Sequence, residues 1–241
     1  MDNWSPTYQD LEDVRPFMEV ADERGYSPGE NAEEMEVAEY NGSNVFVRPQ
    51  DEESASYDLM AEVLADELDY DIRVPDASFD SEEGVLITSE LGGEGELEAS
   101  EHAAESLVDT YAFEALMGQG DILDNTSTDS EGFYAFDFEN AGGSINGVYS
   151  AVKSEAESAA EEHDLVQYIG DFDAVGERAV EMAENLDLES LAESARSRGV
   201  SWDVYNDIES NIETARSLDE TAGGPVFEPQ SSEDDEGVEL L

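Results

Sequence analysis

Residues 120 to 143 have the sequence GDILDNTSTDSEGFYAFDFENAGG, in which acids and an amide surround a polar cluster and an apolar run. Asp121 and Asp124-Asn125 precede a Thr/Ser/Asp/Gly cluster that predicts a turn. Residues 133–136 are apolar and predict a buried strand, which ends at Asp137 and Glu139. We expect the two acidic ends to lie beside one another. Oxygen ligands on such a short hairpin suit a hard cation such as Mg²⁺.

Two other interpretations of this stretch stay open. An acidic loop in a very acidic protein is the simpler one, but the segment between the two acid groups is apolar, which favours a strand. A calcium loop of EF-hand type is the other. The D-x-[DN]-x-[DN]-G spacing is absent, however, and no glutamate closes the loop at its twelfth position.

Composition points to a folded protein with an extreme surface. The chain has 241 residues, 39% of them hydrophobic, with 64 acids against 9 lysines and arginines and a net charge of −55. Such self-repulsion is relieved at molar salt, where the screening length falls to about 3 Å. We therefore expect a halophilic, cytoplasmic protein, similar in composition to haloarchaeal proteins. No basic patch is available for nucleic-acid polymers, and no apolar run suits a membrane helix.

Periodicity and turn signals predict an α+β fold. We expect a helix from residue 5 to 26 bent near Pro16, a hairpin over residues 35–50 turning at Asn41-Gly42, a helix over 52–70, a strand or strand entry at 72–75, a strand over 84–91, a helix over 101–117, helices throughout 148–218, and an acidic tail from 219 to 241. Gly92-Gly93 marks the predicted boundary between an N-terminal lobe, residues 1–92, and a mainly helical C-terminal lobe, residues 93–218.

The order of these elements resembles the protein-kinase-like superfamily. The motifs that carry the resemblance are VFVRP at 45–49, SYDLMAEVLADELDYDIRVP at 56–75, GVLITSELGG at 84–93, GDILDN at 120–125 and GFYAFDFENA at 132–141. Within the superfamily, they are most similar to the atypical small kinases: HipA-type serine kinases, phosphatidylinositol kinases and aminoglycoside phosphotransferases. The resemblance implies two lobes, a small antiparallel sheet and a mostly helical C-terminal lobe.

The resemblance also implies an activity, an ATP- and Mg²⁺-dependent transfer of phosphate to a hydroxyl of a protein or small molecule. Asp121 resembles the catalytic aspartate that accepts the proton of the substrate hydroxyl. Asn125 and Asp137 resemble the two Mg²⁺ ligands. Positioning and charge neutralisation are what this chemistry needs from a protein.

The nucleotide would contact the N-terminal lobe. Arg48 resembles the lysine that binds the nucleotide phosphates, and either Asp58 or Glu62 on the next helix resembles its acidic partner. Glu90 and Leu91 resemble the segment between the lobes that contacts adenine.

Three features favour a different class, a pseudokinase that binds or regulates without phosphoryl transfer. Asp121 and Asn125 are four positions apart where the family has five. Arginine stands at position 48 where a compact ammonium is usual. No Gly-rich phosphate loop is evident. Simpler interpretations stay open as well. Arg48 could pair with surface acids, and Asn125 could form an ordinary Asx turn. The chain could also be an acidic α+β domain with no nucleotide site.

Overall fold

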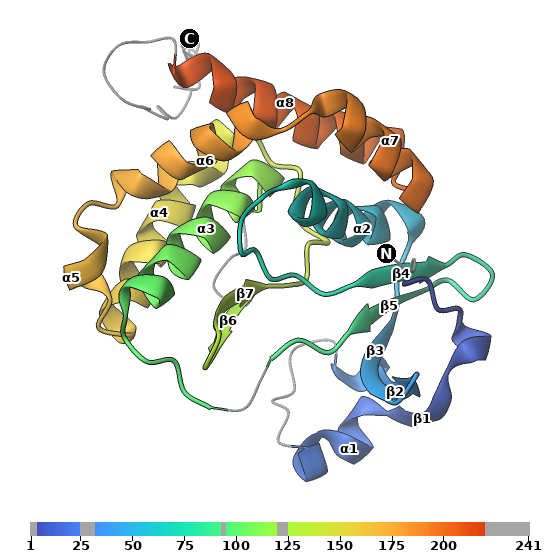
Figure 1. Ribbon diagram of the computed structural model, residues 1–241. Coiled ribbons are helices and arrows are strands. Elements are labelled where there is room, and N and C mark those ends of the chain that lie inside the picture. The colour runs from blue at the N-terminus through green and yellow to red at the C-terminus, as the bar shows by residue number, and fades with distance from the viewer. Residues whose placement is uncertain (1–3, 25–31, 93–94, 120–124, 220–241) are drawn as a thin grey trace, which may run out of the picture.

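The computed structural model describes residues 4–24, 32–92, 95–119 and 125–219, and Figure 1 shows their arrangement. Its fold is α+β, as the sequence predicts. A five-stranded antiparallel sheet has the order β1-β2-β3-β5-β4, and a separate hairpin pairs β6 with β7. The strands are β1 (Glu12–Pro16), β2 (Glu36–Tyr40), β3 (Ser43–Pro49), β4 (Ala77–Asp80), β5 (Val85–Ser89), β6 (Thr126–Asp129) and β7 (Gly132–Ala135).

Helices make up most of the remainder. They are α1 (Phe17–Arg24), α2 (Glu52–Glu67), α3 (Glu101–Met117), α4 (Ile145–Glu162), α5 (Val166–Ile169), α6 (Asp173–Asn185), α7 (Leu188–Arg198) and α8 (Trp202–Asp219), with short 3₁₀ turns η1 (Tyr8–Asp10) and η2 (Ala32–Glu34). The predicted helices at 52–70, 101–117 and 148–218 are confirmed within a few residues. Among the described residues, no helix is both long enough and apolar enough to cross a membrane.

The β2–β3 hairpin forms where the sequence predicts it. Tyr40 pairs with Ser43 across a two-residue turn, and Asn41 and Gly42 have φ values of 52° and 82°. Positive φ at both central residues is the geometry that Asn-Gly favours and that matches the twist of the two strands. The turn fixes the register, so that Val45 and Val47 pack on one face of the sheet while Phe46 and Arg48 lie on the other.

Helix α2 begins where an acidic residue caps it. The Asp51 carboxylate accepts hydrogen bonds from the backbone N–H groups of Glu53 and Ser54, at 3.1 and 3.0 Å. These bonds satisfy donors that would otherwise lack a partner in the first turn. Ala55 and Leu59 of α2 pack on Leu86, the residue paired with Arg48 in the sheet. Helix α2 therefore covers the face of the sheet on which Arg48 lies.

The N-terminal helix predicted over residues 5–26 is wrong in its first half, where η1 and the edge strand β1 form. Pro16 lacks an N–H, and its ring disfavours the helical conformation for the residue before it. At a sheet edge the missing donor costs little. Leu11 and Val14, which share helical spacing, instead pack against one face of the sheet.

Two further segments differ from the prediction. Residues 72–75 lie outside the strands, and β4 begins only at Ala77, beyond Pro75. The polar residues from Thr126 to Asp129, predicted as a turn, form strand β6, and only Ser130 and Glu131 make the turn. The segment expected as an acidic tail lies almost wholly outside the described residues. The division into residues 1–92 and 93–218 stays a prediction.

The main hydrophobic core surrounds α3, which packs against α4, α6, α8 and β7 (Figure 1). Phe113, Leu116 and Met117 of α3 are fully buried. Ser100 caps the helix at its start, since its hydroxyl accepts from the N–H of Ala103 at 3.1 Å. Gly118 ends it in the left-handed conformation, with φ 66°.

Replacing Gly118 with alanine should destabilise the protein far more than the same change at Gly199, which ends α7 with φ 79°. Both alanines would adopt an unfavourable backbone conformation, at about 1–2 kcal/mol. A Cβ at Gly118 would also overlap the Gly143 carbonyl, whereas nothing lies within 4 Å of one at Gly199. We expect an additional loss of about 1–3 kcal/mol at Gly118, measured by urea unfolding. Equal losses would show that this close approach does not constrain the fold.

Candidate functional site

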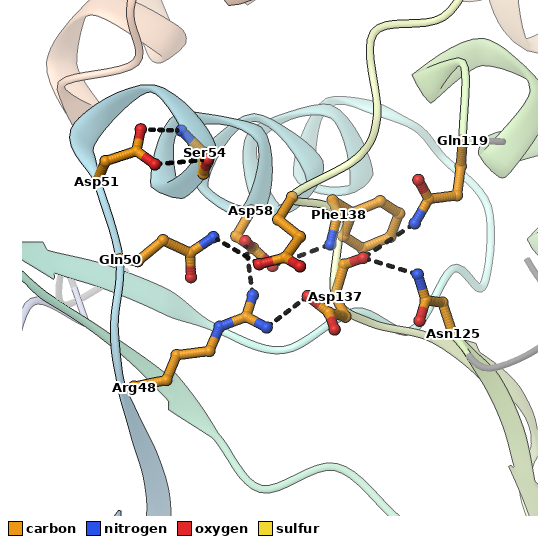
Figure 2. A network of polar contacts seen from close by, with 10 residues as sticks. Arg48, Gln50, Asp51, Ser54, Asp58, Gln119, Asn125, Asp137 and Phe138 are labelled. Atoms are coloured by element: carbon orange, nitrogen blue, oxygen red, sulfur yellow. Dashed lines mark hydrogen bonds and ion pairs between the residues drawn. The ribbon is translucent and has the colours of Figure 1, made fainter. Parts of the chain in front are cut away.

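Four of the residues predicted from the sequence come together at one point. They are Arg48 near the end of β3, Asp58 on α2, Asn125 just before β6, and Asp137 just after β7 (Figure 2). Arg48 and Asp137, which are hydrogen-bonded here, are 89 positions apart in the sequence. The alternation of β3 places Arg48 on the face that α2 covers, and the β6–β7 hairpin delivers Asp137 from the opposite side.

Arg48 joins two acids from different elements. Its Nη2 lies 3.0 Å from Oδ2 of Asp58, and its Nη1 is hydrogen-bonded to Oδ1 of Asp137. The two acids differ in environment, because the Asp58 side chain is 5% exposed and that of Asp137 is 34% exposed. Asp58 is thus the fixed partner of the guanidinium, while Asp137 lies open to a ligand.

The pair with Asp58 is held at a cost. Burial raises the pKa of the Asp58 carboxyl to about 6, although the charge of Arg48 lowers it and that of Asp137 raises it again. Its Oδ1 also accepts the backbone N–H of Phe138 at 3.2 Å. Burial acts to lower the pKa of Arg48, but the charges of Asp58 and Asp137 outweigh this, and the pKa is raised. Arg48 remains a cation between them.

The main chain at Asp137 is strained and firmly held. Its φ is 60°, a left-handed conformation that is uncommon for a residue with a side chain. Its carbonyl oxygen accepts two side-chain amides, Nε2 of Gln119 and Nδ2 of Asn125, each at 2.9 Å. Phe138, the next residue, is buried against Phe113 of α3. Strain held by surrounding contacts is concentrated at functional sites.

The structure also distinguishes the two acids that the sequence left as alternatives for Arg48. Asp58 pairs with it. Glu62, one turn further along α2, instead forms an ion pair with Arg198 of α7 and accepts the backbone N–H of Ala77 at 3.0 Å. Glu62 therefore joins α2 to α7 and β4.

The other predicted residues lie apart from this centre or outside the described residues. Glu90 accepts a hydrogen bond from Nδ2 of Asn44 at 2.7 Å. Glu90 and Leu91 line a cavity of about 670 Å³ at the start of β3 and the end of β5, which Trp4 and Tyr40 also line. Arg48 is not among its lining residues. Asp121, the predicted catalytic residue, lies outside the described residues.

Sequence reasoning missed two contributors to the centre, Gln119 and Gln50, and gave Glu139 no role beyond that of a second acid after the predicted strand. Gln119 is fully buried directly after the glycine that ends α3, where a buried amide is an unusual neighbour for an apolar helix. Gln50 and Glu139 lie beside Arg48, with 3.5 Å between Nε2 of Gln50 and Oε2 of Glu139. The charge of Glu139 adds to the field that raises the pKa of Arg48. Glu139 was visible in the sequence as the second acid after β7.

The donor set limits what the described residues can hold by themselves. Across residues 4–24, 32–92, 95–119 and 125–219, no group of three or more Asp, Glu or His side chains is arranged to bind a metal ion. Nε of Arg48 is buried and has no hydrogen-bond partner there. The partly exposed side chains of Arg48 and Asp137 could together contact an anionic ligand that carries its own cation, such as a metal-bound phosphate.

No protein-family model matches the chain, and the search of curated proteins also gave no match.

Proposed function

We propose that this protein is a kinase-like phosphotransferase that binds ATP and Mg²⁺ and acts on a hydroxyl of a protein or small molecule. One observation carries the proposal. Arg48, on a sheet strand, bridges a buried acid on the next helix and a strained, partly exposed acid that follows a hairpin. The same three elements, in this chain order, position the phosphate-binding cation and the metal-binding acid of the family that the sequence resembles.

Each residue has a physical role in this proposal. Arg48 orients nucleotide phosphates, and Asp58 keeps its guanidinium in place. Asp137 and Asn125 would hold Mg²⁺, whose remaining ligands would be phosphates and waters. When bound, Mg²⁺ neutralises charge on the transferred phosphate. Asp121 is the proposed acceptor of the hydroxyl proton, and Glu90 and Leu91 are the proposed adenine contacts between two lobes.

The alternative is a pseudokinase-type binding or regulatory module. Arg48 favours it, because a guanidinium bonded to both Asp58 and Asp137 occupies a carboxylate that would otherwise be available to a metal. Arginine is also a planar donor rather than a compact ammonium. ATP turnover by the wild type and by Asp121→Ala separates the two classes, since only a phosphotransferase would lose turnover on this change.

We further propose that the protein works in a salt-rich cytoplasm. The net charge of −55 supports this, because at molar salt the repulsion between like charges is largely screened. Only a few of the 64 acids belong to the candidate site, and most of the others need no role beyond interacting with solvent and salt. Binding experiments therefore belong in molar KCl.

Adding ATP with Mg²⁺ in molar KCl should raise the melting temperature of the wild-type protein. A ligand at about 100 times its dissociation constant stabilises the folded state by about 2.7 kcal/mol. For a chain of this length that corresponds to a shift of roughly 5–10 °C. ATP with EDTA is the matched control and should give a smaller shift. No shift with either would exclude both the phosphotransferase and the nucleotide-binding pseudokinase, and leave an acidic α+β domain.

A further inference from the structure

A buried acid of α3, Glu114, has no place in the proposed reaction. It is 0% exposed, and its Oε1 accepts a hydrogen bond from the hydroxyl of Thr126 at 2.7 Å. Its Oε2 is also buried and has no hydrogen-bond partner in the described part of the chain. Burial raises the pKa of this carboxyl to about 8.

A carboxyl group at this buried position lowers the stability of the fold. A buried polar atom without a partner is unfavourable, and an apolar residue of similar size would avoid the penalty. Polar groups that reduce stability are concentrated where function needs them. The contacts of Glu114 should therefore indicate which function its carboxyl serves.

The carboxyl of Glu114 is connected to Asp137 through Thr126 and Asn125. Thr126 is the first residue of β6, and Asn125 stands directly before it. The carbonyl of Asn125 accepts the backbone N–H of Phe136 at 2.9 Å, while its side chain donates to the Asp137 carbonyl. Holding Thr126 therefore fixes the position from which the Asn125 amide reaches Asp137.

The backbone of Glu114 is connected to Asp137 through Gln119. Its carbonyl oxygen accepts the backbone N–H of Gln119 at 3.0 Å, and the side chain of Gln119 is the second amide on the Asp137 carbonyl. Both amides that hold Asp137 in its strained conformation are thus attached to the same residue. One attachment runs through the main chain, and the other depends on the carboxyl.

We propose that Glu114 is a positioning residue that acts through Thr126 to hold the Asn125 amide against Asp137. The role needs a buried acceptor for the Thr126 hydroxyl, and Glu114 supplies one from the central helix α3. The link from this role to catalysis rests on the proposed function. The contacts of Glu114 with Thr126 and Gln119 do not depend on that function. The competing explanation is that Glu114 merely fills space under β6.

Three variants and one control distinguish these explanations. Glu114→Gln keeps an acceptor for Thr126, Glu114→Leu keeps the volume without the acceptor, and Thr126→Val removes the donor. Leu107→Ala, at another fully buried position of α3, is the control for lost packing. Two quantities are measured in each variant that folds: the exchange rate of the Asn125 side-chain amide by NMR, and the dissociation constant for ATP with Mg²⁺.

We expect Glu114→Leu and Thr126→Val to speed exchange of the Asn125 amide and to weaken ATP–Mg²⁺ binding by about tenfold, at the lower end of the range for residues behind a metal ligand. Glu114→Gln should stay within about twofold of wild type in both. Leu107→Ala should melt earlier without either change. If Thr126→Val or Glu114→Leu leaves amide exchange at the wild-type rate, the proposal is wrong. If wild type binds no ATP, the proposed function fails, and amide exchange alone decides the role of Glu114.

Discussion

Replacing Asp137 with asparagine should lower ATP turnover by about a thousandfold. This corresponds to roughly 4 kcal/mol in the activation barrier, the scale expected when a catalytic metal loses an anionic ligand. Asparagine keeps the size of the side chain and removes its charge, so the local packing is preserved. Turnover is measured as phosphate release from ATP in molar KCl, because this needs no knowledge of the physiological acceptor.

Asp173→Asn is the matched control. Asp173 also pairs with a cation, Lys153, but its side chain is 63% exposed on α6. The substitution removes one negative charge and one ion pair, as Asp137→Asn does, and turnover should remain close to wild type. Equal turnover in wild type and Asp137→Asn would contradict the metal assignment. A loss in both variants would instead point to a general effect of charge on this highly acidic protein.

Local chemistry explains which parts of the fold could be predicted. The β2–β3 hairpin depends on Asn41-Gly42, whose conformation is set by the residues themselves. Helix α2 depends on its acidic cap and apolar face. By contrast, the segment before Pro16 has helical spacing, and its strand conformation comes from pairing with β2, at Arg15 and Val37. Only tertiary structure supplies that partner.

The same division applies to the candidate site. Asp137 stood out because an acid that ends an apolar strand has to be paired, ligated or exposed. The choice between Asp58 and Glu62 was beyond the sequence, since both lie on α2 one turn apart and both pair with an arginine in the structure. Glu114 gave no signal, because nothing local shows that its carboxyl accepts the hydroxyl of Thr126.

Replacing Arg48 with methionine should destabilise the protein by about 2–3 kcal/mol at pH 8, because the Asp58 carboxyl, whose pKa is about 6 with Arg48 present, must then stay charged without its cation or take up a proton. The free energy of unfolding is measured by urea titration in molar KCl. Lys153→Met is the matched control, since it makes the net charge more negative by the same amount. The Lys153–Asp173 pair is largely exposed, and its loss should cost only about 0–1 kcal/mol.

The penalty at position 48 should also depend on pH. The pKa of Asp58 is raised in the folded state to about 6, mainly by burial, so its favourable contribution is present at low pH and is lost as the pH rises through 6. Removing Arg48 takes away the influence that lowers this pKa, and the pKa must rise further. The destabilisation by Arg48→Met should therefore shrink between pH 8 and pH 5, as Asp58 takes up a proton.

The double variant Arg48→Met/Asp58→Asn tests the cause. It leaves no charge to bury and keeps an oxygen acceptor for the backbone N–H of Phe138, so its stability at pH 8 should return to within about 1 kcal/mol of wild type. The pH dependence assigned to Asp58 should vanish with it. A double variant as unstable as Arg48→Met alone would locate the loss elsewhere, at the contact with Asp137. In that case Arg48 would stabilise the fold through the exposed acid, and Asp58 would not be the fixed partner on which the proposed orientation of the guanidinium depends.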